Sequence, residues 1–575
     1  MNYIWSKKQF PDHQAVNNLS KSLNINEKIA QLLVNRGVHN YREAENFFNP
    51  SLKNVHNPFL FKQMDKAVAL LIKALDQQQA IRLYGDYDVD GTTAVAMMMN
   101  TLRTRTANID YYIPDRYKEG YGLSQEGVDQ AIKDNVSLFI TLDCGIRSVD
   151  LIQQLINHGI HVIVCDHHEP GEALPNAVLL DPKIPGESYP FQGLSGAGVG
   201  MKLLEALYVA KKWSTETLYN QLDLLALSIA ADIVPVTDEN RIYACYGLQL
   251  VNKVPRPAFK KMLIAANRTG ACRLSDFVFG IAPRINAAGR IRTGRTAVEC
   301  MLTYTNQNID ELIQEIESDN QIRKTLDQQI TQEALSKLSI EAADRNVNIV
   351  YDSSWHKGVV GIVASRVIEK FPLPTIILAE IDGVLSGSAR TVGSFDIHQA
   401  LVNCQDLLLQ FGGHQHAAGL SLPQENFEAL KSRLNELAGH YFNENSRLPI
   451  LEYEENLDFT QIFEQESIKT IPKLVRILDR FEPFGPGNQR PVFRANAVQC
   501  ESYRLLKDAH LKLSLKQRNH NITLDAIGFS MKEKEEQCSE GNKIEILYNL
   551  DVNTFNNQSR VQLLIKDIQA PEENL

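Results

Sequence analysis

The chain has 575 residues, more than one hydrophobic core accommodates, so its length predicts about three or four domains. Its composition is that of an ordinary globular protein, and the formal net charge of −10 gives no support for nucleic-acid binding from bulk charge alone. The eight cysteines form no CxxC pair, which argues against zinc ribbons and a disulfide framework. We expect a cytoplasmic protein, because no apolar run reaches the roughly 18 residues of a membrane span and the N-terminal segment lacks a secretory signal.

Short apolar runs alternate with helix-period stretches between about residues 80 and 235. The apolar runs occupy residues 80–84, 109–113, 136–142 and 161–165. Strand–helix alternation of this kind is typical of a parallel sheet with helices on both faces. The sequence therefore predicts a doubly wound α/β domain.

The rest of the chain divides by pattern. Residues 306–343 are polar and contain neither proline nor glycine, which predicts one long helix. Apolar runs of a second α/β unit follow, and the last region alternates with a period of two, which favours a small antiparallel barrel of the OB type. The expected domains are a helical lead-in (1–45), a first α/β domain (46–305), a connecting helix (306–344), a second α/β domain (345–448) and an OB-like barrel (449–575).

The strongest chemical signal is the segment YGDYDVDGTTA at 84–94, in which Asp86, Asp88 and Asp90 alternate with apolar or aromatic residues. Three carboxylates so close together repel one another unless cations neutralise them. An EF-hand loop is the obvious alternative, but its twelfth position requires glutamate and is Met97 here.

Further metal-ligand residues follow the next apolar runs. Asp143 comes after one, Asp166-His167-His168 comes after another, and Asp232 ends an apolar run farther along. In an open α/β sheet, the loops at the carboxyl ends of the strands meet at one crevice. Oxygen and imidazole ligands without thiolates favour Mn²⁺ or Mg²⁺, and this many carboxylates suits a site for two divalent ions that hydrolyses a phosphate ester.

These motifs together resemble the DHH phosphoesterase family, and within it the branch of single-stranded-DNA-specific 5′→3′ exonucleases. The resemblance extends over about residues 45–570. Supporting segments lie at 112–124, 195–200, 231–235, 283–291, 356–366, 387–397 and 411–420.

The resemblance implies a set of metal ligands, namely Asp88, Asp90, Asp143, His167 and Asp232. It implies that Asp143 bridges the ions, that Asp86 and Asp166 belong to the catalytic cluster, and that His168 contacts the scissile phosphate. Many members have a histidine four residues before the first ligand of the Asp-x-Asp pair. That position is Tyr84 here, and Asp86 is expected to compensate.

The resemblance also implies substrate-binding residues. Arg116, Ser388 and Arg390 match the 5′-phosphate pocket of the family, which suits the planar guanidinium fork. The turn at Gly413 and His414 allows close approach of backbone to phosphate. Arg284, Asn286 and Arg290 are expected to contact the DNA backbone, with structural salt bridges of the two arginines as the alternative.

The C-terminal barrel carries basic residues between 503 and 520, from Arg504 to Arg518, interleaved with few aromatics, which suits single-stranded DNA, although a solvated strand face is an equal alternative. SGAGVG (195–200) lacks the spacing of a dinucleotide motif, but a helix N-terminus there could hold phosphate weakly. The resemblance implies a monomer that cooperates with a helicase and a single-strand-binding protein. Two alternatives stay open: a DHH enzyme acting on oligoribonucleotides or cyclic dinucleotides, and a non-catalytic replication scaffold, which would have lost its ligands.

Overall fold

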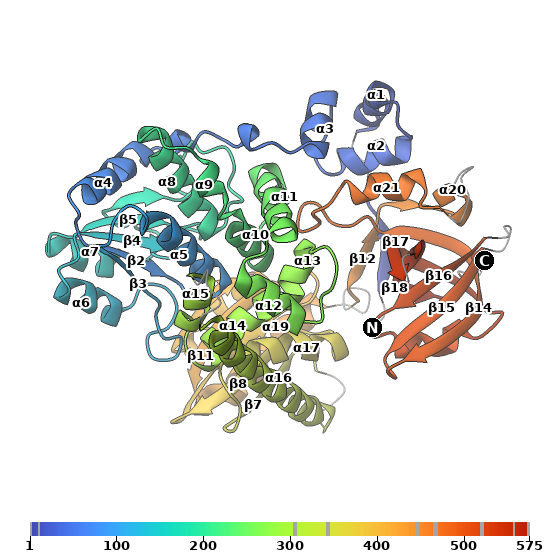
Figure 1. Cartoon of the computed structure of the whole chain (residues 1–575). Coiled ribbons are helices and arrows are strands. Elements are labelled where there is room, and N and C mark those ends of the chain that lie inside the picture. The colour runs from blue at the N-terminus through green and yellow to red at the C-terminus, as the bar shows by residue number, and fades with distance from the viewer. Residues whose placement is uncertain are drawn as a thin grey trace. The chain divides into compact units, whose positions relative to one another are not determined.

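The computed structural model describes residues 3–9, 12–302, 308–340, 345–442, 448–463, 470–517, 522–555 and 558–571. It divides into two compact units, drawn in Figure 1. The central unit comprises Pro50–Gln328 and Pro483–Gln489. The flanking unit comprises Met1–Asn49, Gln329–Glu482 and Arg490–Leu575. No helix in these described parts of the chain is long and apolar enough to cross a membrane.

The central unit is built on a five-stranded parallel sheet with the strand order β3-β2-β4-β5-β6. Its strands are β2 (Ile81–Gly85), β3 (Ile109–Tyr112), β4 (Leu138–Leu142), β5 (His161–Cys165) and β6 (Val178–Leu180). Every residue of β2 and β4 is buried, as expected for strands covered by helices on both faces. The predicted α/β class is therefore confirmed, and β6 is an additional short strand.

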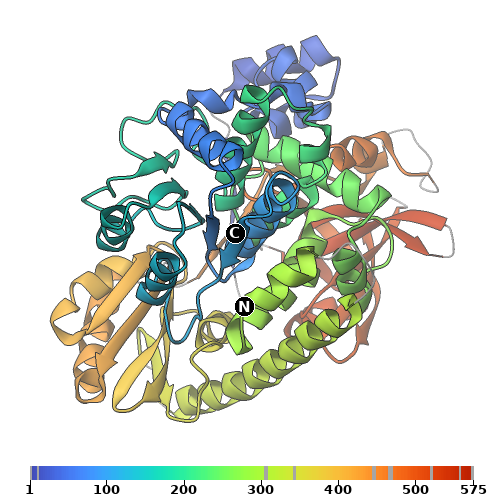
Figure 2. The ribbon, with the colours of Figure 1, turned by 60° about the vertical axis from the view of Figure 1, so that its left-hand side comes forward.

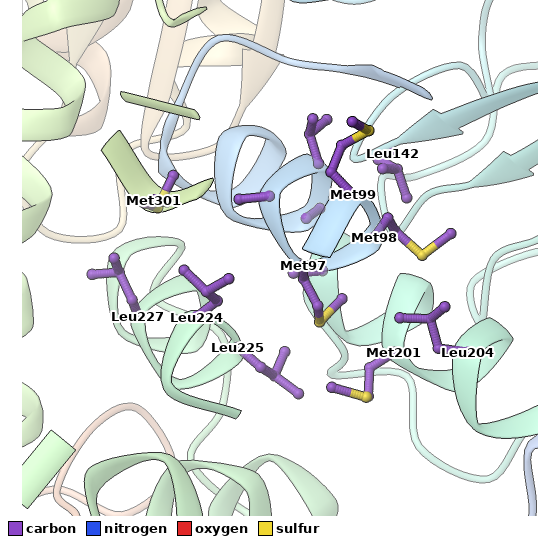
Figure 3. Close-up of a cluster of buried hydrophobic side chains, with 14 of the residues drawn as sticks. Met97, Met98, Met99, Leu142, Met201, Leu204, Leu224, Leu225, Leu227 and Met301 are labelled. Carbon is purple, nitrogen blue, oxygen red and sulfur yellow. The ribbon is translucent and has the colours of Figure 1, made fainter. Parts of the chain in front are cut away.

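Helices cover the sheet from both sides. On one face lie α4 (Met64–Asp76), α5 (Val89–Leu102) and α8 (Gly196–Ala210), and on the other α6 (Gln125–Lys133) and α7 (Val149–Asn157). Figure 3 shows methionines of α5 and α8 gathered with leucines of α10 (Leu222–Ala231) in one buried cluster. Methionine fills irregular gaps well, which suits a junction of several helices.

The remaining helices of the central unit follow the sheet. They are α9 (Glu216–Tyr219), α11 (Asp238–Lys253), α12 (Pro257–Ala265), α13 (Leu274–Asp276), a π-helical turn (Phe277–Ile281), α14 (Ala282–Ile291) and α15 (Arg295–Leu302), with short 3₁₀ turns at Leu52–Asn54 and Pro58–Leu60. Residues 483–489 belong to this unit, where Val236 N donates to Pro486 O at 2.7 Å.

The predicted connecting helix is α16 (Ile309–Ile340), a single helix of 32 residues that Figure 2 shows as one continuous ribbon. Part of its buried surface is polar, including Asp319, Asn320 and Asp327. Because polar residues occupy part of the buried face, the sequence of this helix lacks a continuous apolar stripe.

The flanking unit begins with β1 (Ile4–Lys7), which pairs in parallel with β12 (Ile450–Tyr453). Three helices follow β1 along the chain. The helices are α1 (His13–Leu23), α2 (Glu27–Val34) and α3 (Tyr41–Phe48). Each helix is capped by a side chain that accepts a backbone N–H: Asp12, Asn26 and Asn40.

A mixed five-stranded sheet in the order β10-β11-β9-β8-β7 forms the second α/β part. Its strands are β7 (Asn348–Asp352), β8 (Thr375–Ile381), β9 (Val384–Arg390), β10 (Gln410–His414) and β11 (Ala417–Pro423), and its helices are α17 (Val360–Lys370), α18 (Ile397–Val402) and α19 (Phe427–Tyr441), with 3₁₀ turns at Gln405–Leu407 and Gln424–Asn426. Only β7 and β8 pair in parallel.

The C-terminal part is a closed barrel in the order β14-β15-β16-β18-β17, and a β14–β17 pairing closes it. Its strands are β14 (Phe493–Leu506), β15 (His510–Gln517), β16 (Thr523–Gly528), β17 (Lys543–Phe555) and β18 (Gln558–Gln569), beside β13 (Glu455–Asn456), α20 (Phe459–Phe463), α21 (Lys473–Asp479) and a 3₁₀ helix at Lys532–Cys538. The predicted OB-type barrel is confirmed, although the β16–β18 pair is parallel rather than antiparallel.

A close approach of two helices in the central unit generates a stability prediction. A methyl group on Gly247 of α11 would overlap the carbonyl oxygen of Leu222 and lie 2.5 Å from Ala226 Cβ on α10. Gly247→Ala should lower the free energy of unfolding by about 1–3 kcal/mol, because overpacking outweighs the roughly 1 kcal/mol by which alanine favours a helix. Urea unfolding followed by circular dichroism measures the change. Gly171→Ala, whose methyl meets no atom closer than 3.7 Å, is the matched control, and an equal effect of both would contradict the packing argument.

Candidate metal centre

The predicted ligand residues lie at the carboxyl ends of three neighbouring strands. Asp86 follows β2, Asp143 follows β4, and the segment Asp166–His168 follows β5. Asp232 comes from elsewhere, directly after the buried helix α10. The predicted convergence at one edge of the parallel sheet is what the structure has, with a helix rather than a strand delivering the last carboxylate.

Side chains at this edge form three groups whose ligand atoms lie within 4.8 Å of one another. The groups are Asp86–Asp88–Asp143, Asp143–His167–His168 and Asp90–His167–Asp232. Asp143 and His167 each belong to two groups, so the groups join into one continuous cluster. Such sharing is the arrangement that two closely spaced divalent ions require.

The contacts of His167 fit metal ligation better than hydrogen bonding. Its Nε2 atom lies 3.1 Å from Asp143 Oδ1, 3.5 Å from Asp232 Oδ2 and 3.8 Å from Asp90 Oδ2. Within the described chain, Nε2 of His167 and Oδ1 of Asp143 are buried without a hydrogen-bond partner. Two ligands at about 2.1 Å from one octahedral ion lie roughly 3 Å apart, which matches the His167–Asp143 distance. The residues present therefore fit divalent cations.

Asp90 is held by backbone and hydroxyl donors. Its Oδ2 accepts from Gly196 N at 2.6 Å, and its Oδ1 accepts from Ala197 N at 2.9 Å and from Ser228 Oγ at 2.7 Å. The first two donors are the N-terminal amides of α8, which favour a negative charge. The N-terminus of the SGAGVG segment thus binds a carboxylate of the cluster, which is a different partner from the phosphate considered in the sequence.

The close approach of α8 also shapes the position of Asp143. A methyl group on Gly196 would lie 2.6 Å from Asp143 Cα, so this position accepts no side chain. Asp143 itself has φ of 62°, an uncommon conformation for a residue with a side chain. Its N–H donates to Cys165 O at 2.9 Å, which ties the end of β4 to the end of β5. Backbone strain of this kind is concentrated at functional sites.

Asp166 supports the cluster and belongs to none of its three ligand groups. Its Oδ2 accepts from Ile146 N at 2.9 Å, and its Oδ1 accepts from His167 N at 2.7 Å and lies 2.8 Å from His168 Nδ1. Burial raises its pKa, but the hydrogen bond and charge of His168 and the bond from Ile146 N hold the pKa at about 2. Asp166 is therefore a permanently charged residue that orients the two histidines.

Electrostatics oppose the full ionisation of Asp86, Asp143 and Asp232 in the absence of cations. Burial and neighbouring carboxylates raise the pKa of Asp86 and of Asp143 well above the usual range. Burial, followed by the charges of Asp90 and Asp88, raises the pKa of Asp232 to about 9. Burial lowers the pKa of His167, which favours the neutral imidazole that binds metals. Bound cations would remove this repulsion.

Tyr84 occupies the position where a histidine was expected from the resemblance. Its side chain is fully buried, and its hydroxyl donates to Gly122 O at 2.9 Å and accepts from Ser124 N at 3.1 Å. The hydroxyl is thus engaged with a loop, while Asp86 stands in a ligand group with Asp88 and Asp143. Asp86 therefore stands close enough to Asp88 and Asp143 to bind an ion with them, and its compensation for the missing histidine stays a prediction.

Arginines of the central unit differ in their surroundings. Arg116 is half-buried and lies over the ring of Tyr87 at 4.8 Å. Burial and the nearby charge of Arg116 lower the pKa of Arg290 to about 10, so two guanidiniums lie close enough to repel. Arg284 is buried and paired with Glu317, and it donates to Gly280 O at 2.6 Å, which favours the structural interpretation for that residue. Asn286 is half-buried on α14.

The flanking unit brings Ser388 and Arg390 together on β9, at the beginning of α17. A methyl group on Gly361 of α17 would lie 3.0 Å from Ser388 Oγ and 3.3 Å from Arg390 Nη2. Both side chains are half-buried, and burial lowers the pKa of Arg390. Gly413 and His414 are exposed at the end of β10 in the same sheet.

The barrel presents basic side chains on neighbouring strands. Arg504 of β14 is the direct cross-strand partner of Lys512 of β15, and Lys516 lies farther along β15. Like charges directly opposite each other are destabilising unless an anion lies between them. Arg518, from the same predicted basic run, lies outside the described residues.

Two residues near the cluster were missed in the sequence. Asp181 directly follows β6 and is buried, and burial raises its pKa to about 7. The signal for it was the same as for Asp143: an apolar run, VLL, that ends in aspartate. Tyr121 lies in a polar loop, and its hydroxyl lies 2.8 Å from His168 Nε2. In the sequence GYGLS, the two glycines that flank Tyr121 were the only sign of an unusual backbone conformation at this residue.

The parallel sheet with an Asp/His cluster at its strand ends defines a phosphoesterase of the DHH class. Residues 80–229 match the model of the DHH family, N-terminal domain, residues 344–440 match that of the DHHA1 domain, and residues 466–567 match that of the RecJ OB domain. The chain belongs to the RecJ family.

Similar proteins support this assignment along nearly the whole chain. The single-stranded-DNA-specific exonuclease RecJ of Bacillus subtilis is 35% identical, covering 99% of this chain and 71% of that protein. The RecJ of Escherichia coli is 32% identical, with 94% and 95% covered. The crystal structure of RecJ from Thermus thermophilus in complex with Mn²⁺ superimposes with a TM-score of 0.83 at 26% identity, covering 99% of this chain and 80% of that one. A second crystal structure of RecJ from the same organism contains Mg²⁺.

These findings favour neither alternative that the sequence left open. The match to the RecJ OB domain argues against a short DHH enzyme for oligoribonucleotides or cyclic dinucleotides. A non-catalytic scaffold would have lost ligands, whereas all the carboxylates and histidines of the three groups are present.

The electrostatics of the cluster predict how pH affects the metal-free protein. Asp232, with a pKa of about 9 when folded and an ordinary value of 3.8, keeps a proton that the unfolded chain releases between these limits. In EDTA, the free energy of unfolding should therefore fall as pH rises from about 4 to 9, by up to about 1.4 kcal/mol per pH unit for such a group. Thermal and urea unfolding at several pH values would measure the slope.

Two comparisons control this prediction. Asp232→Asn cannot ionise, so this variant should show a shallower slope than the wild type. Mn²⁺ added at pH 8 should raise the stability of the wild type more than that of the variant, because the ion replaces the retained protons. Stability that rises with pH in EDTA to the same extent in both proteins would contradict the proposed repulsion.

Proposed function

We propose that this chain is a metal-dependent exonuclease that hydrolyses single-stranded DNA in the 5′→3′ direction and releases 5′-mononucleotides. The observation that carries the proposal is the buried cluster in which Asp143 and His167 are each shared by two ligand groups. The similarity to proteins named single-stranded-DNA-specific exonucleases, over nearly the whole chain, supports the choice of substrate.

The proposed metal ligands are those implied by the resemblance: Asp88, Asp90, Asp143, His167 and Asp232, with Asp143 as the bridging residue. Asp86 is proposed to complete the set in place of the histidine absent at Tyr84. When bound, two Mn²⁺ or Mg²⁺ ions would supply Lewis-acid chemistry and stabilise the charge that develops at phosphorus during hydrolysis.

Residues around the cluster would orient the DNA. His168, held by Asp166, is proposed to contact the scissile phosphate, since its side chain is more exposed than that of His167. Arg116 and Arg290 would bind phosphates of the strand, because two nearby guanidiniums that repel each other gain from an anion between them. Asn286 is proposed to assist them by contacting the DNA backbone.

The 5′ end of the strand is proposed to bind in the flanking unit. Ser388 and Arg390 offer a hydroxyl and a guanidinium side by side, which together suit a terminal phosphate dianion. Gly413 and His414 would contact the adjacent backbone. A site that recognises a terminal phosphate accounts for hydrolysis that starts at a 5′ end.

The barrel is proposed to track the single strand, with the Arg504–Lys512 pair as its phosphate-binding centre. We further propose a monomer that acts in DNA repair and recombination, with a helicase and a single-strand-binding protein as partners. The proposed substrate implies a cytoplasmic location.

The proposed reaction is tested with a 5′-phosphorylated single-stranded DNA oligomer labelled at its 3′ end, beside matched RNA and blunt duplex, in Mn²⁺. We expect progressive shortening of the DNA alone, release of 5′-mononucleotides, and complete loss of cleavage in EDTA. Rapid cleavage of short RNA without cleavage of DNA would contradict the proposed substrate and assign the enzyme to oligoribonucleotides.

Asp143→Ala should abolish this cleavage while the far-UV circular dichroism spectrum stays unchanged, because the bridging carboxylate is lost. Asp150→Asn, in the first turn of α7, is the matched control and should retain full activity. An active Asp143→Ala protein that still binds Mn²⁺ would refute the ligand assignment.

The proposed 5′-phosphate site predicts a substrate-dependent effect of Arg390→Ala. Hydrogen bonds to charged groups contribute about 1.5–3 kcal/mol, so kcat/KM on 5′-phosphorylated DNA should fall about tenfold to hundredfold. The loss on 5′-hydroxyl DNA should be much smaller. Arg433→Ala removes a partly exposed arginine that pairs with Asp406 and serves as the control. Equal losses on both substrates would count against the site.

A further inference from the structure

One exposed aromatic side chain, Tyr121, stands beside the candidate metal centre on a firmly anchored loop. The glycines on either side, Gly120 and Gly122, have φ of 87° and 82°, conformations that residues with side chains rarely adopt. The hydroxyl of the buried Tyr84 hydrogen-bonds to this loop: it donates to Gly122 O at 2.9 Å and accepts from Ser124 N at 3.1 Å. The backbone around Tyr121 is thus fixed on both sides of the residue.

A carboxylate of the same loop adds to the anchoring. Glu119 Oε1 accepts from Asp115 N at 2.7 Å, while its Oε2 accepts from Ser124 Oγ at 2.5 Å and from Tyr112 Oη at 2.9 Å. Tyr121, by contrast, is 56% exposed. A loop with so many internal bonds and one exposed ring is built to present that side chain.

The side chain of Tyr121 contacts His168 at the ring nitrogen that faces away from Asp166. The hydroxyl lies 2.8 Å from His168 Nε2, and the two rings meet edge to face at 5.7 Å and 73°. The other nitrogen, Nδ1, lies 2.8 Å from Asp166 Oδ1. His168 is therefore held at both nitrogens, and a flipped ring could keep neither bond.

The position of His168 makes this restraint relevant to catalysis. Its side chain is 30% exposed against 9% for His167, and both belong to one ligand group with Asp143. His168 is thus the member of this group that a substrate reaches first. A half-exposed imidazole restrained on one side alone would sample several rotamers.

We propose that Tyr121 is a positioning residue that holds His168 in the orientation needed to meet the scissile phosphate. The inference rests on the proposed function, in which His168 contacts that phosphate. Tyr121 acts through the imidazole: its hydroxyl holds Nε2 and places the ring before the substrate arrives. A phosphate oxygen then replaces the hydroxyl at Nε2, while Nδ1 stays with Asp166. The buried Tyr84 contributes indirectly, because it fixes the loop from which Tyr121 projects.

The test is Tyr121→Phe, which keeps the ring and removes the hydroxyl. Loss of an outer-shell partner typically costs about tenfold to hundredfold in activity, so kcat on 5′-phosphorylated single-stranded DNA in Mn²⁺ should fall by this factor while KM stays within about twofold. Mn²⁺ affinity, measured by calorimetry, should be unchanged. Tyr41→Phe is a matched control, because Tyr41 is 57% exposed on α3, and its kinetics should equal those of the wild type.

A double-mutant cycle separates a positioning role from a structural one. In the His168→Gln background, measured in single turnovers with enzyme in excess, Tyr121→Phe should change the rate by less than about twofold, because the group it acts through is gone. Equal losses in both backgrounds, a change in KM alone, or no loss in the wild-type background would overturn the positioning role. A wild-type protein inactive on all DNA substrates would overturn both this inference and the proposed function.

Discussion

Mutual repulsion of buried carboxylates is the constraint on which the centre of this molecule depends. Burial and nearby carboxylates raise the pKa of Asp86, of Asp143 and of the partly buried Asp232. Hydrophobic packing brings them there, because the parallel sheet must bury its strands and thereby gathers their carboxyl ends. Divalent cations are the natural complement of such a cluster, and the surrounding loops are arranged around that need.

The fold compensates part of this charge with its own dipoles and hydrogen bonds. The N-terminal amides of α8 stabilise the carboxylate of Asp90, and the Ile146 amide and His168 stabilise that of Asp166. Within the described residues, Asp86 and Asp143 by contrast keep buried carboxylate oxygens that have no hydrogen-bond partner, and the two residues stand in one ligand group. Asp166 thus supports the scaffold, Asp86 and Asp143 are available to an ion, and Asp90 does both.

Much of this arrangement was predictable from the sequence, for physical reasons. Strands β2 to β5 lie within two residues of the apolar runs, since buried parallel strands are continuously apolar. The strand β1 was not predicted, because its partner is more than 400 residues away. A period of two reveals strands but not their direction, so the parallel β16–β18 pair was also missed. In the site, the contact between Tyr121 and His168 depends on how a loop folds back, and no local pattern encodes it.

The double engagement of Asp90 has an evolutionary consequence. Its carboxylate ties α8 to the end of the sheet and also stands with His167 and Asp232 in a ligand group. Selection for a stable fold therefore protects Asp90 even where selection for hydrolysis is relaxed. In a lineage that lost hydrolysis and kept only the fold, we expect Asp232 to be substituted before Asp90, and Asp90 to be retained for its contacts with α8.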